Sequence, residues 1–459
     1  MLDLDTAAQV LGGVRSGPNV RFTGVTTDSR QSRLGELFVA LHGEHFDGHA
    51  FIDAALSAGA VAALVDESRQ LAHADAPLIR VRDTRQALGA MAAFWRRRYK
   101  VPLVAVTGSN GKTTVKDMLA AALTAGRRDD AVLATAGNLN NDIGVPLMLL
   151  RLRDRHRCAV IEMGMNHLGE ISYLTGLARP TVAVVTNAGV AHIGEVGSRE
   201  DIARAKGEIY AGLGETGTAV INADDAYAQY WRDLNLARRV VEFGIDTPAA
   251  IRAKFELSQA GSLISVQTPD SEYVVRLRVP GVHNVRNALA AAACAHVLGS
   301  APADVSAGLG SYAGTKGRLQ RIAARAGATL IDDTYNANPD SVTAAIAVLA
   351  AAGGKRVLVL GDMGELGEEG PALHREIGQQ ARRAGIDHLL TLGELSEVAA
   401  RAFGKGATHF RELDALCTAL ERLLGRSTTV LVKGSRFMRM ERVVERFANG
   451  EPLPANRGH

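Results

Sequence analysis

The residues best suited to chemistry form one glycine-containing stretch, Thr107–Thr114, with the sequence TGSNGKTT. It follows an apolar run and precedes a helical pattern, so backbone N–H groups at the helix start would point at an anion. Lys112 adds a compact positive charge, and Thr113 is placed to offer a hydroxyl to Mg²⁺. The usual G-x-x-x-x-G-K-[ST] loop has a glycine where this chain has Val106. The pattern therefore predicts a phosphate loop of a particular subtype; an ordinary glycine-rich turn is the alternative.

Three further residues could hold a metal near that loop. Glu162 ends the apolar run CAVIE, and His192 follows the run TVAVVTNAGVA. Ligands of open α/β sheets gather at the carboxyl ends of strands, and a hard cation needs oxygen ligands there. Lys206 lies in the helical stretch ARAKGEI shortly after His192. A solvated or helix-capping Glu162, a structural His192 and an ordinary charged helix face at Lys206 remain the alternatives for each residue alone.

The elements that must position these residues form three series along the chain. Residues 1–100 alternate short strand-like runs with Ala-rich helical ones and end in a basic helix, which the Val101–Pro102 step breaks. Residues 101–315 contain near-continuous apolar strands, as a parallel sheet covered on both faces requires, followed by an alternating, antiparallel-looking patch. Residues 316–459 hold another βα series. We predict an α/β fold with three domains: a smaller N-terminal domain, a central P-loop-type mainly parallel sheet and a Rossmann-like C-terminal domain.

Composition narrows the functional class. The chain has 459 residues, 47% of them hydrophobic, and a net charge of only +3, which gives no reason to expect nucleic acid or a membrane surface as partner. Its three cysteines lie far apart, which argues against disulfides or a thiolate zinc site. The N-terminus does not read as a signal peptide, and the most apolar stretch, 288–299, is too short to span a bilayer. We expect a soluble cytoplasmic protein without membrane insertion.

Many ordered blocks carry a family resemblance that covers nearly the whole chain. They are TGSNGKTTVKDM, GNLNNDIGVP, IEMGMNHLGEI, TNAGVAHIGEVGS, AKGEI, PGVHNVRNALAAAA, GRLQ, IDDTYNANPDS, LGDMGELG and LVKGSRFMRME. Together they resemble the Mur ligases, whose phosphate loop also lacks the glycine missing at Val106. Within that family they are closest to the members that add D-alanyl-D-alanine to a UDP-N-acetylmuramoyl tripeptide.

The resemblance implies ATP and two Mg²⁺ ions as cofactors. Its ATP-binding positions are Gly108, Ser109, Asn110, Gly111, Lys112, Thr113, Thr114, Asn287, Arg318 and Asp333. Its metal positions are Thr113, Glu162, His192 and Lys206, and its catalytic positions are Lys112, Lys206, His192 and Arg318. The family carbamylates the lysine matched by Lys206, which would turn an ammonium into an anionic oxygen ligand. That modification requires a neutral amine, hence a pKa below about 10.4.

The resemblance also implies how substrates are shared among the domains. Residues 1–100 would bind the UDP end of the acceptor, 101–315 would bind ATP, and 316–459 would bind the incoming dipeptide and complete the ATP site. The candidate substrate-binding residues are Ser29, Arg30, Gly43, His49, Asn138, Asn140, Asn141, Asp142, Asn336, Asn338, Lys433, Ser435 and Arg436. Ordinary turns are the alternative for the first eight of these.

The expected function is an ATP-dependent amide-forming ligase of peptidoglycan precursor synthesis that works through an acyl phosphate, as a monomer. Other Mur-type ligases that add a diamino acid, and folylpolyglutamate synthases, are alternatives within the ligase class. The D-N-P-R-type motif usual in diamino-acid-adding enzymes is absent from the sequence. A P-loop ATPase that acts as a conformational switch or scaffold is the alternative outside that class.

Overall fold

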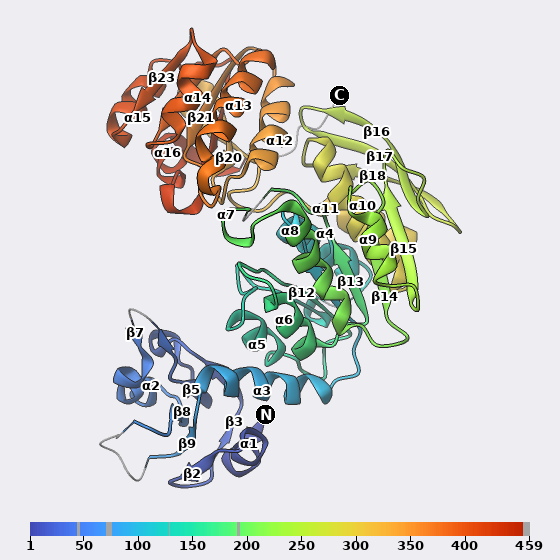
Figure 1. The fold of residues 1–459 in the computed structure, drawn as a ribbon, viewed down its shortest axis with the longest axis vertical. Helices are drawn as coiled ribbons and strands as arrows, with labels where there is room; N and C mark the ends of the chain where they lie inside the picture. The colour runs from blue at the N-terminus through green and yellow to red at the C-terminus, as the bar shows by residue number, and fades with distance from the viewer. Residues whose placement is uncertain (44–45, 70–75, 128, 191–192, 453–459) are drawn as a thin grey trace.

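In the computed structural model the chain folds into three units, each built on its own β-sheet (Figure 1). The structure describes residues 1–43, 46–69, 76–127, 129–190 and 193–452. Helices alternate with strands in all three units. The predicted three-domain α/β fold class is thereby confirmed. No helix in the described ranges is long and apolar enough to cross a bilayer.

The first unit holds a five-stranded sheet of order β2-β9-β8-β5-β4, in which only β2 is antiparallel to its neighbour. The strands are β2 (Val14–Ser16), β4 (Gly24–Thr26), β5 (Glu36–Val39), β8 (Ala62–Asp66) and β9 (Leu78–Val81). Two short pairs flank it, β1 (Leu2–Asp3) with β3 (Arg21–Phe22) and β6 (His42–Gly43) with β7 (Phe46–Asp47). Its helices are α1 (Leu4–Leu11), α2 (Ile52–Ser57), η1 (Ser29–Gln31) and η2 (Gly48–Phe51).

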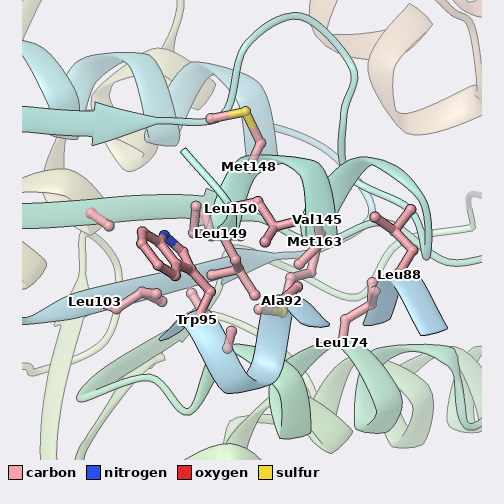
Figure 2. Close-up of a cluster of buried hydrophobic side chains, with 14 of the residues drawn as sticks. Leu88, Ala92, Trp95, Leu103, Val145, Met148, Leu149, Leu150, Met163 and Leu174 are labelled. Atoms are coloured by element: carbon pink, nitrogen blue, oxygen red, sulfur yellow. The ribbon is translucent and has the colours of Figure 1, made fainter. Parts of the chain in front are cut away.

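Helix α3 (Thr84–Arg97) joins the first unit to the second and belongs to the core of both. Its apolar residues recur at helical spacing, so one face is buried along most of its length. Figure 2 shows Leu88 and Trp95 of α3 beside Leu103, Leu149 and Leu174 of the second unit. The indole N–H of Trp95 donates to the carbonyl of Leu152 at 3.1 Å. One continuous apolar cluster therefore runs through the first two units.

The second unit is a nine-stranded sheet of order β11-β12-β10-β13-β14-β15-β16-β17-β18. The strands from β11 to β16 in this order are parallel, and β17 and β18 add antiparallel pairs, as the alternating patch predicted. The strands are β10 (Leu103–Thr107), β11 (Val132–Ala134), β12 (Cys158–Glu162), β13 (Val182–Val185), β14 (Thr218–Asn222), β15 (Arg239–Gly244), β16 (Ile251–Ser258), β17 (Gly261–Gln267) and β18 (Glu272–Leu277).

Helices cover both faces of the central sheet. Helices α4 (Lys112–Thr124), α10 (Val282–Val297) and α11 (Pro302–Ser311) share a cluster with one face. The other face packs with α3, α5 (Gly144–Leu149), α6 (Glu170–Ala178), α8 (Arg199–Gly207) and α9 (Ala228–Asp233). Short helices η3 (Asp129–Ala131), α7 (Ile193–Val196) and η4 (Glu208–Gly212) connect these elements.

Side-chain alternation along β10 explains the unusual residue at 106. Leu103 and Ala105 belong to one core cluster, and Val104 and Val106 to the other, because successive residues of a strand point to opposite faces. Val106 is fully buried and pairs with Glu162 and Val184. The chain leaves the strand only at Gly108, so position 106 needs an apolar strand residue.

The third unit is a seven-stranded sheet of order β23-β22-β21-β24-β20-β19-β25. Its strands are β19 (Gln320–Ala324), β20 (Thr329–Asp333), β21 (Lys355–Gly361), β22 (His388–Leu392), β23 (Ala407–Phe410), β24 (Thr428–Lys433) and β25 (Ala448–Pro452). Strand β19 pairs antiparallel with both β20 and β25, and the other neighbouring strands are parallel. The helices are α12 (Pro339–Ala350), α13 (Gly370–Arg383), α14 (Ser396–Phe403), α15 (Leu413–Glu421) and α16 (Glu441–Phe447), with short turns η5 (Arg325–Gly327), η6 (Gly367–Glu369) and η7 (Arg436–Met438).

The third unit has its own core. Its two apolar clusters contain only residues from Leu319 onward, and among the described residues no apolar cluster joins it to the second unit. Among the described residues, hydrogen bonds cross this boundary around one cavity, described next, and one further backbone bond joins the N–H of Gly194 to the carbonyl of Glu365 at 3.0 Å. The first two units thus share an apolar core, whereas the third meets them through polar contacts.

Candidate active site between the second and third units

A cavity of about 1680 Å³ opens where the carboxyl ends of β10, β12 and β13 face the third unit. The phosphate loop, Glu162, Asn287, Arg318 and Asp333 all line it. So do Asn138, Asn140, Asn141, Asp142, Asn336, Asn338 and Lys433. Residues separated by more than 300 positions in the sequence therefore meet in one place, as expected for the carboxyl edge of a parallel sheet.

The phosphate loop needs its two glycines for reasons of space and conformation. Gly108 has φ 146° and Gly111 has φ 82°, values that side-chain-bearing residues rarely adopt. A Cβ on Gly108 would lie 1.9 Å from Thr186 Oγ1, and a Cβ on Gly111 would lie 2.3 Å from Asn287 Oδ1. The second clash shows that Asn287 of α10 lies directly against the loop.

The segment after β13 holds the loop in shape. The N–H of Ser109 donates to the carbonyl of Asn187 at 2.9 Å, and the N–H of Asn110 donates to Asn187 Oδ1 at 3.0 Å. The carbonyl of Asn110 accepts from Thr186 Oγ1 at 2.6 Å and from Asn187 Nδ2 at 3.0 Å. Thr186 and Asn187 are not among the residues predicted from the sequence, although their position at the end of an apolar strand was a usable signal.

The ammonium of Lys112 folds back onto the loop. It donates to the carbonyls of Gly108 at 2.6 Å and Ser109 at 3.3 Å. Burial lowers the pKa of Lys112 from its ordinary value, and the negative charge of Glu162 opposes that shift. The positive charge is thus held at the mouth of the loop, where a phosphate would exchange with these carbonyls.

Glu162 and Lys206 each present a buried polar atom without a partner. Glu162 is 2% exposed; its Oε1 accepts from Asn140 Nδ2 at 2.7 Å, while Oε2 has no hydrogen-bond partner among the described residues. Lys206 is fully buried, and its Nζ likewise lacks a partner in the described chain. Burial, and then the charge of Lys112, hold the pKa of Lys206 well below its ordinary value. A buried polar atom without a hydrogen-bond partner costs free energy. Both atoms therefore indicate a bound ligand, ion or modification that would pair with them.

His192, the remaining predicted metal position, lies outside the described residues. Within the described ranges no three His, Cys, Asp or Glu side chains gather closely enough to hold a metal by themselves. Glu162 and Thr113 could instead each supply a single oxygen ligand, which suits an ion that also binds phosphate oxygens and water.

Two residues of the third unit contact the phosphate loop directly. Arg318 Nη2 donates to Thr113 Oγ1 at 2.9 Å, and its guanidinium lies 4.2 Å from the centroid of the Tyr335 ring. Asn338, the N-cap of α12, forms a reciprocal amide pair with Asn110. Asp340 Oδ2 accepts from the N–H of Val190 at 3.0 Å.

Asp333 and Lys433 form a buried ion pair at the cavity wall. Lys433 Nζ donates to Asp333 Oδ2 at 2.6 Å and to the carbonyl of Asn336 at 2.9 Å. Asp333 Oδ1 also accepts from the N–H of Leu319 at 3.2 Å. The ammonium of Lys433 is therefore engaged within the third unit. His283, half-buried in the same wall, has its pKa lowered to about 4 by burial.

Ser435 and Arg436, the other two dipeptide candidates, do not line the cavity. Ser435 Oγ donates to the carbonyl of Ala337 at 3.0 Å and accepts from the N–H of Gly364 at 2.8 Å. Arg436 is exposed and pairs with Glu441 at 3.0 Å. Ser435 thus connects β24 to neighbouring loops of the third unit.

The asparagine-rich turn 138–142 forms the wall nearest the first unit. Asn141 Oδ1 accepts from the N–H of Gly144 at 2.8 Å at the start of α5, and Asn140 holds Glu162. Both carboxylate oxygens of Asp142 accept from the guanidinium of Arg85 on α3. This wall is therefore tied to the helix that carries the first unit.

The four uridine-site candidates lie in the first unit and outside the cavity lining. Ser29 begins η1, Gly43 ends β6, and the exposed Arg30 pairs with Asp28 at 2.9 Å. His49 is buried; its Nδ1 lies 2.7 Å from Asp47 Oδ1, and its Nε2 accepts from the N–H of Asp66 at 3.0 Å. His49 thus supports the local fold through both ring nitrogens.

Comparisons with known proteins agree with this geometry. Residues 21–96 match the family "Mur ligase family, catalytic domain", 106–295 match "Mur ligase middle domain", and 317–436 match "Mur ligase, glutamate ligase domain". The UDP-N-acetylmuramoyl-tripeptide–D-alanyl-D-alanine ligase of Escherichia coli is 43% identical, over 96% of this chain and 97% of that protein. The Bacillus subtilis enzyme of the same name is 36% identical, over 95% and 96%.

Two solved structures share the arrangement over nearly the full length. A crystal structure of MurF from Acinetobacter baumannii superposes with a TM-score of 0.90 at 37% identity, covering 96% of this chain and 97% of that one. MurF ligase from Thermotoga maritima in complex with ADP gives a TM-score of 0.80 at 28% identity, covering 92% and 96%.

Proposed function

Because the chain belongs to the Mur ligase family, we propose that it joins D-alanyl-D-alanine to UDP-N-acetylmuramoyl tripeptide at the expense of ATP. It is an ATP-dependent amide-forming ligase of peptidoglycan precursor synthesis. The observation that carries this function is the full-length match at 43% identity to an enzyme of that name. The hydrogen bond between Arg318 and Thr113 supports this function, because it brings an arginine of the third domain to the phosphate loop of the second domain within one cavity.

The chemistry requires activation because a carboxylate does not react with an amine at neutral pH. A carboxylate oxygen of the tripeptide attacks the γ-phosphorus of ATP, ADP leaves, and an acyl phosphate forms. The amine of D-alanyl-D-alanine then attacks the acyl carbon and loses a proton, and inorganic phosphate departs. Positioning and charge neutralisation do most of the work in phosphoryl transfer.

In the proposed ATP site, the loop from Gly108 to Thr114 takes the phosphates. Lys112 would exchange its two carbonyl partners for phosphate oxygens, and Arg318 would reach the terminal phosphate from the third domain. Asn287 lies against the loop at Gly111 and would contact the base. Asp333, held by Lys433, would contact the ribose.

Mg²⁺ would neutralise charge on the transferring phosphoryl group when bound. Thr113, Glu162 and Lys206 are the described residues that would hold it, with His192 as a further ligand. The unpartnered Oε2 of Glu162 fits a hard cation. The unpartnered amine of Lys206, with its lowered pKa, fits carbamylation, because a neutral amine is the form that reacts with CO₂.

The substrates would extend in two directions from the loop. Asn138, Asn140, Asn141 and Asp142 would line the path of the muramoyl peptide toward the first domain, where Ser29, Arg30, Gly43 and His49 would take the uridine nucleotide. Asn336, Asn338, Lys433, Ser435 and Arg436 would serve the incoming dipeptide; of the last three, only Lys433 borders the cavity. We also propose that the protein acts as a monomer. The three free, buried cysteines suit the reducing cytoplasm.

An acceptor screen tests this function. Purified protein is given ATP, Mg²⁺ and UDP-N-acetylmuramoyl tripeptide, with D-alanyl-D-alanine, single diamino acids or glutamate as the second substrate. Phosphate release should require both the tripeptide and D-alanyl-D-alanine, and Lys112→Ala should release phosphate roughly 10²–10³-fold more slowly. Turnover with a diamino acid or glutamate would favour another ligase of this fold, and release without any amine would favour an ATPase.

A further inference from the structure

The linker between the second and third domains is fastened to the phosphate-loop helix. Thr315 Oγ1 donates to Asp117 Oδ2 at 2.7 Å, and the Tyr312 hydroxyl lies 3.1 Å from the same Thr315 oxygen. Lys116 is 4% exposed and donates to the other carboxylate oxygen of Asp117. Both oxygens of this carboxylate are thus engaged, so Asp117 is a fixed point on α4.

Residues 315–318 form a tight turn that ends at Arg318. The N–H of Arg318 donates to the carbonyl of Thr315 at 2.9 Å, and the two residues form an antiparallel bridge. Gly317 has φ 74° at the third position of this turn, where a positive φ is required in type II turns. The turn therefore fixes Arg318 relative to Thr315.

Asp117 and Thr113 are four residues apart on α4, so their side chains lie on one helix face about 6 Å apart along the axis. Thr315 and Arg318 are the two ends of the turn, and each meets one of these helix residues. The linker thus contacts the helix twice, once through Thr315 and once through Arg318.

We propose that Asp117 and Thr315 are positioning residues: their hydrogen bond holds turn 315–318 on α4 and so presents Arg318 to the phosphate at Thr113. This deepens the proposed function and rests on it. Gly314, just before the turn, has φ 95°, a conformation that glycine adopts without strain.

The test is Thr315→Val, which removes the hydroxyl at nearly constant volume. It should lower kcat about tenfold, as expected for losing a hydrogen bond to a charged group, with KM for the uridine-linked acceptor unchanged. Thr315→Ser should restore kcat. The matched control is Thr268→Val, which removes a 2.8 Å hydroxyl–carboxylate bond to Asp270 outside the cavity lining and should keep wild-type kcat.

A double-mutant cycle with Arg318→Ala shows whether the anchor acts through the arginine. The Thr315→Val effect should largely disappear in the Arg318→Ala background, because coupled residues are non-additive. An undiminished effect in that background, or wild-type kcat for Thr315→Val, would overturn the proposal. Wild-type protein without dipeptide-dependent phosphate release would instead overturn the proposed function, so the two failures are distinguishable.

Discussion

Asn110 and Asn338 exchange two hydrogen bonds across the boundary between the second and third domains. Asn338 Nδ2 donates to Asn110 Oδ1 at 2.9 Å, and Asn110 Nδ2 donates to Asn338 Oδ1 at 3.4 Å. Asn338 Oδ1 also accepts from the N–H of Ser341 at 2.9 Å, so one side chain caps α12 and contacts the phosphate loop. The N-terminus of helix α12 is thereby held in a fixed position relative to the phosphate loop.

Asn338→Ser separates these two roles. Serine still caps a helix but is too short to reach Asn110, so we expect unchanged thermal stability and a several-fold lower kcat/KM for ATP. Asn338→Ala should add a stability loss of about 1 kcal/mol, the usual cost of a lost cap. Steady-state kinetics and thermal melts of both variants measure this; wild-type ATP kinetics in Asn338→Ser would show that the amide pair plays no part.

Lys112→Ala should lower ligation by roughly 10²–10³-fold, because the variant loses the positive charge at the phosphates. The fold should persist, since among the described residues the ammonium donates only to the loop carbonyls of Gly108 and Ser109. Phosphate release measures the loss, and circular dichroism checks the fold. Near-normal ligation would contradict the phosphate role.

Lys206→Ala should lower the ligation rate by about 100-fold, the upper end of the losses seen when a residue that supports a metal site is removed. Acetate or formate in the buffer should restore part of it, because a small carboxylate can occupy the place of the carbamate oxygens. Lys112→Ala is the matched comparison, and no carboxylate should repair it. A fully active Lys206→Ala protein would remove the case for carbamylation.

Acid should weaken the fold partly through His283. Its folded pKa of about 4 lies below the usual 6.5, so the unfolded chain binds a proton between these values while the native imidazole stays neutral. Stability is therefore lost as pH falls from 6.5 to 4, by on the order of 1–3 kcal/mol from this residue. Denaturant titrations of His283→Gln should show a smaller loss over that window; parallel curves for variant and wild type would refute the assignment.

Local patterns predicted much of the site. The loop from Gly108 to Thr114 directly follows one apolar strand, and Glu162 ends another. Both were predictable because a strand and the turn after it are consecutive in the sequence. Arg318 came from the family resemblance, and the structure places it on Thr113.

Contacts over long separations were beyond the reach of sequence patterns. The ion pair between Lys433 and Asp333 joins residues 100 positions apart, and no sequence pattern around Lys433 predicts that partner. The strand at Ala448–Pro452 contains Asn, Gly and Pro, which disfavour strands, and it forms only because β19 offers a free edge. From the sequence, Asp117 is an ordinary helix residue; its role depends on the hydrogen bond from Thr315, which only the structure shows.

The boundary between the first and second domains is apolar, whereas the boundary between the second and third is polar, so the two boundaries should differ in how easily they open. Parting the first domain from the second would expose the apolar side chains around Trp95, so these two should melt as a single cooperative block. Parting the third from the second breaks hydrogen bonds that water can replace, at little hydrophobic cost. Product release can therefore proceed by swinging the last third of the chain while the other two thirds stay folded as one body.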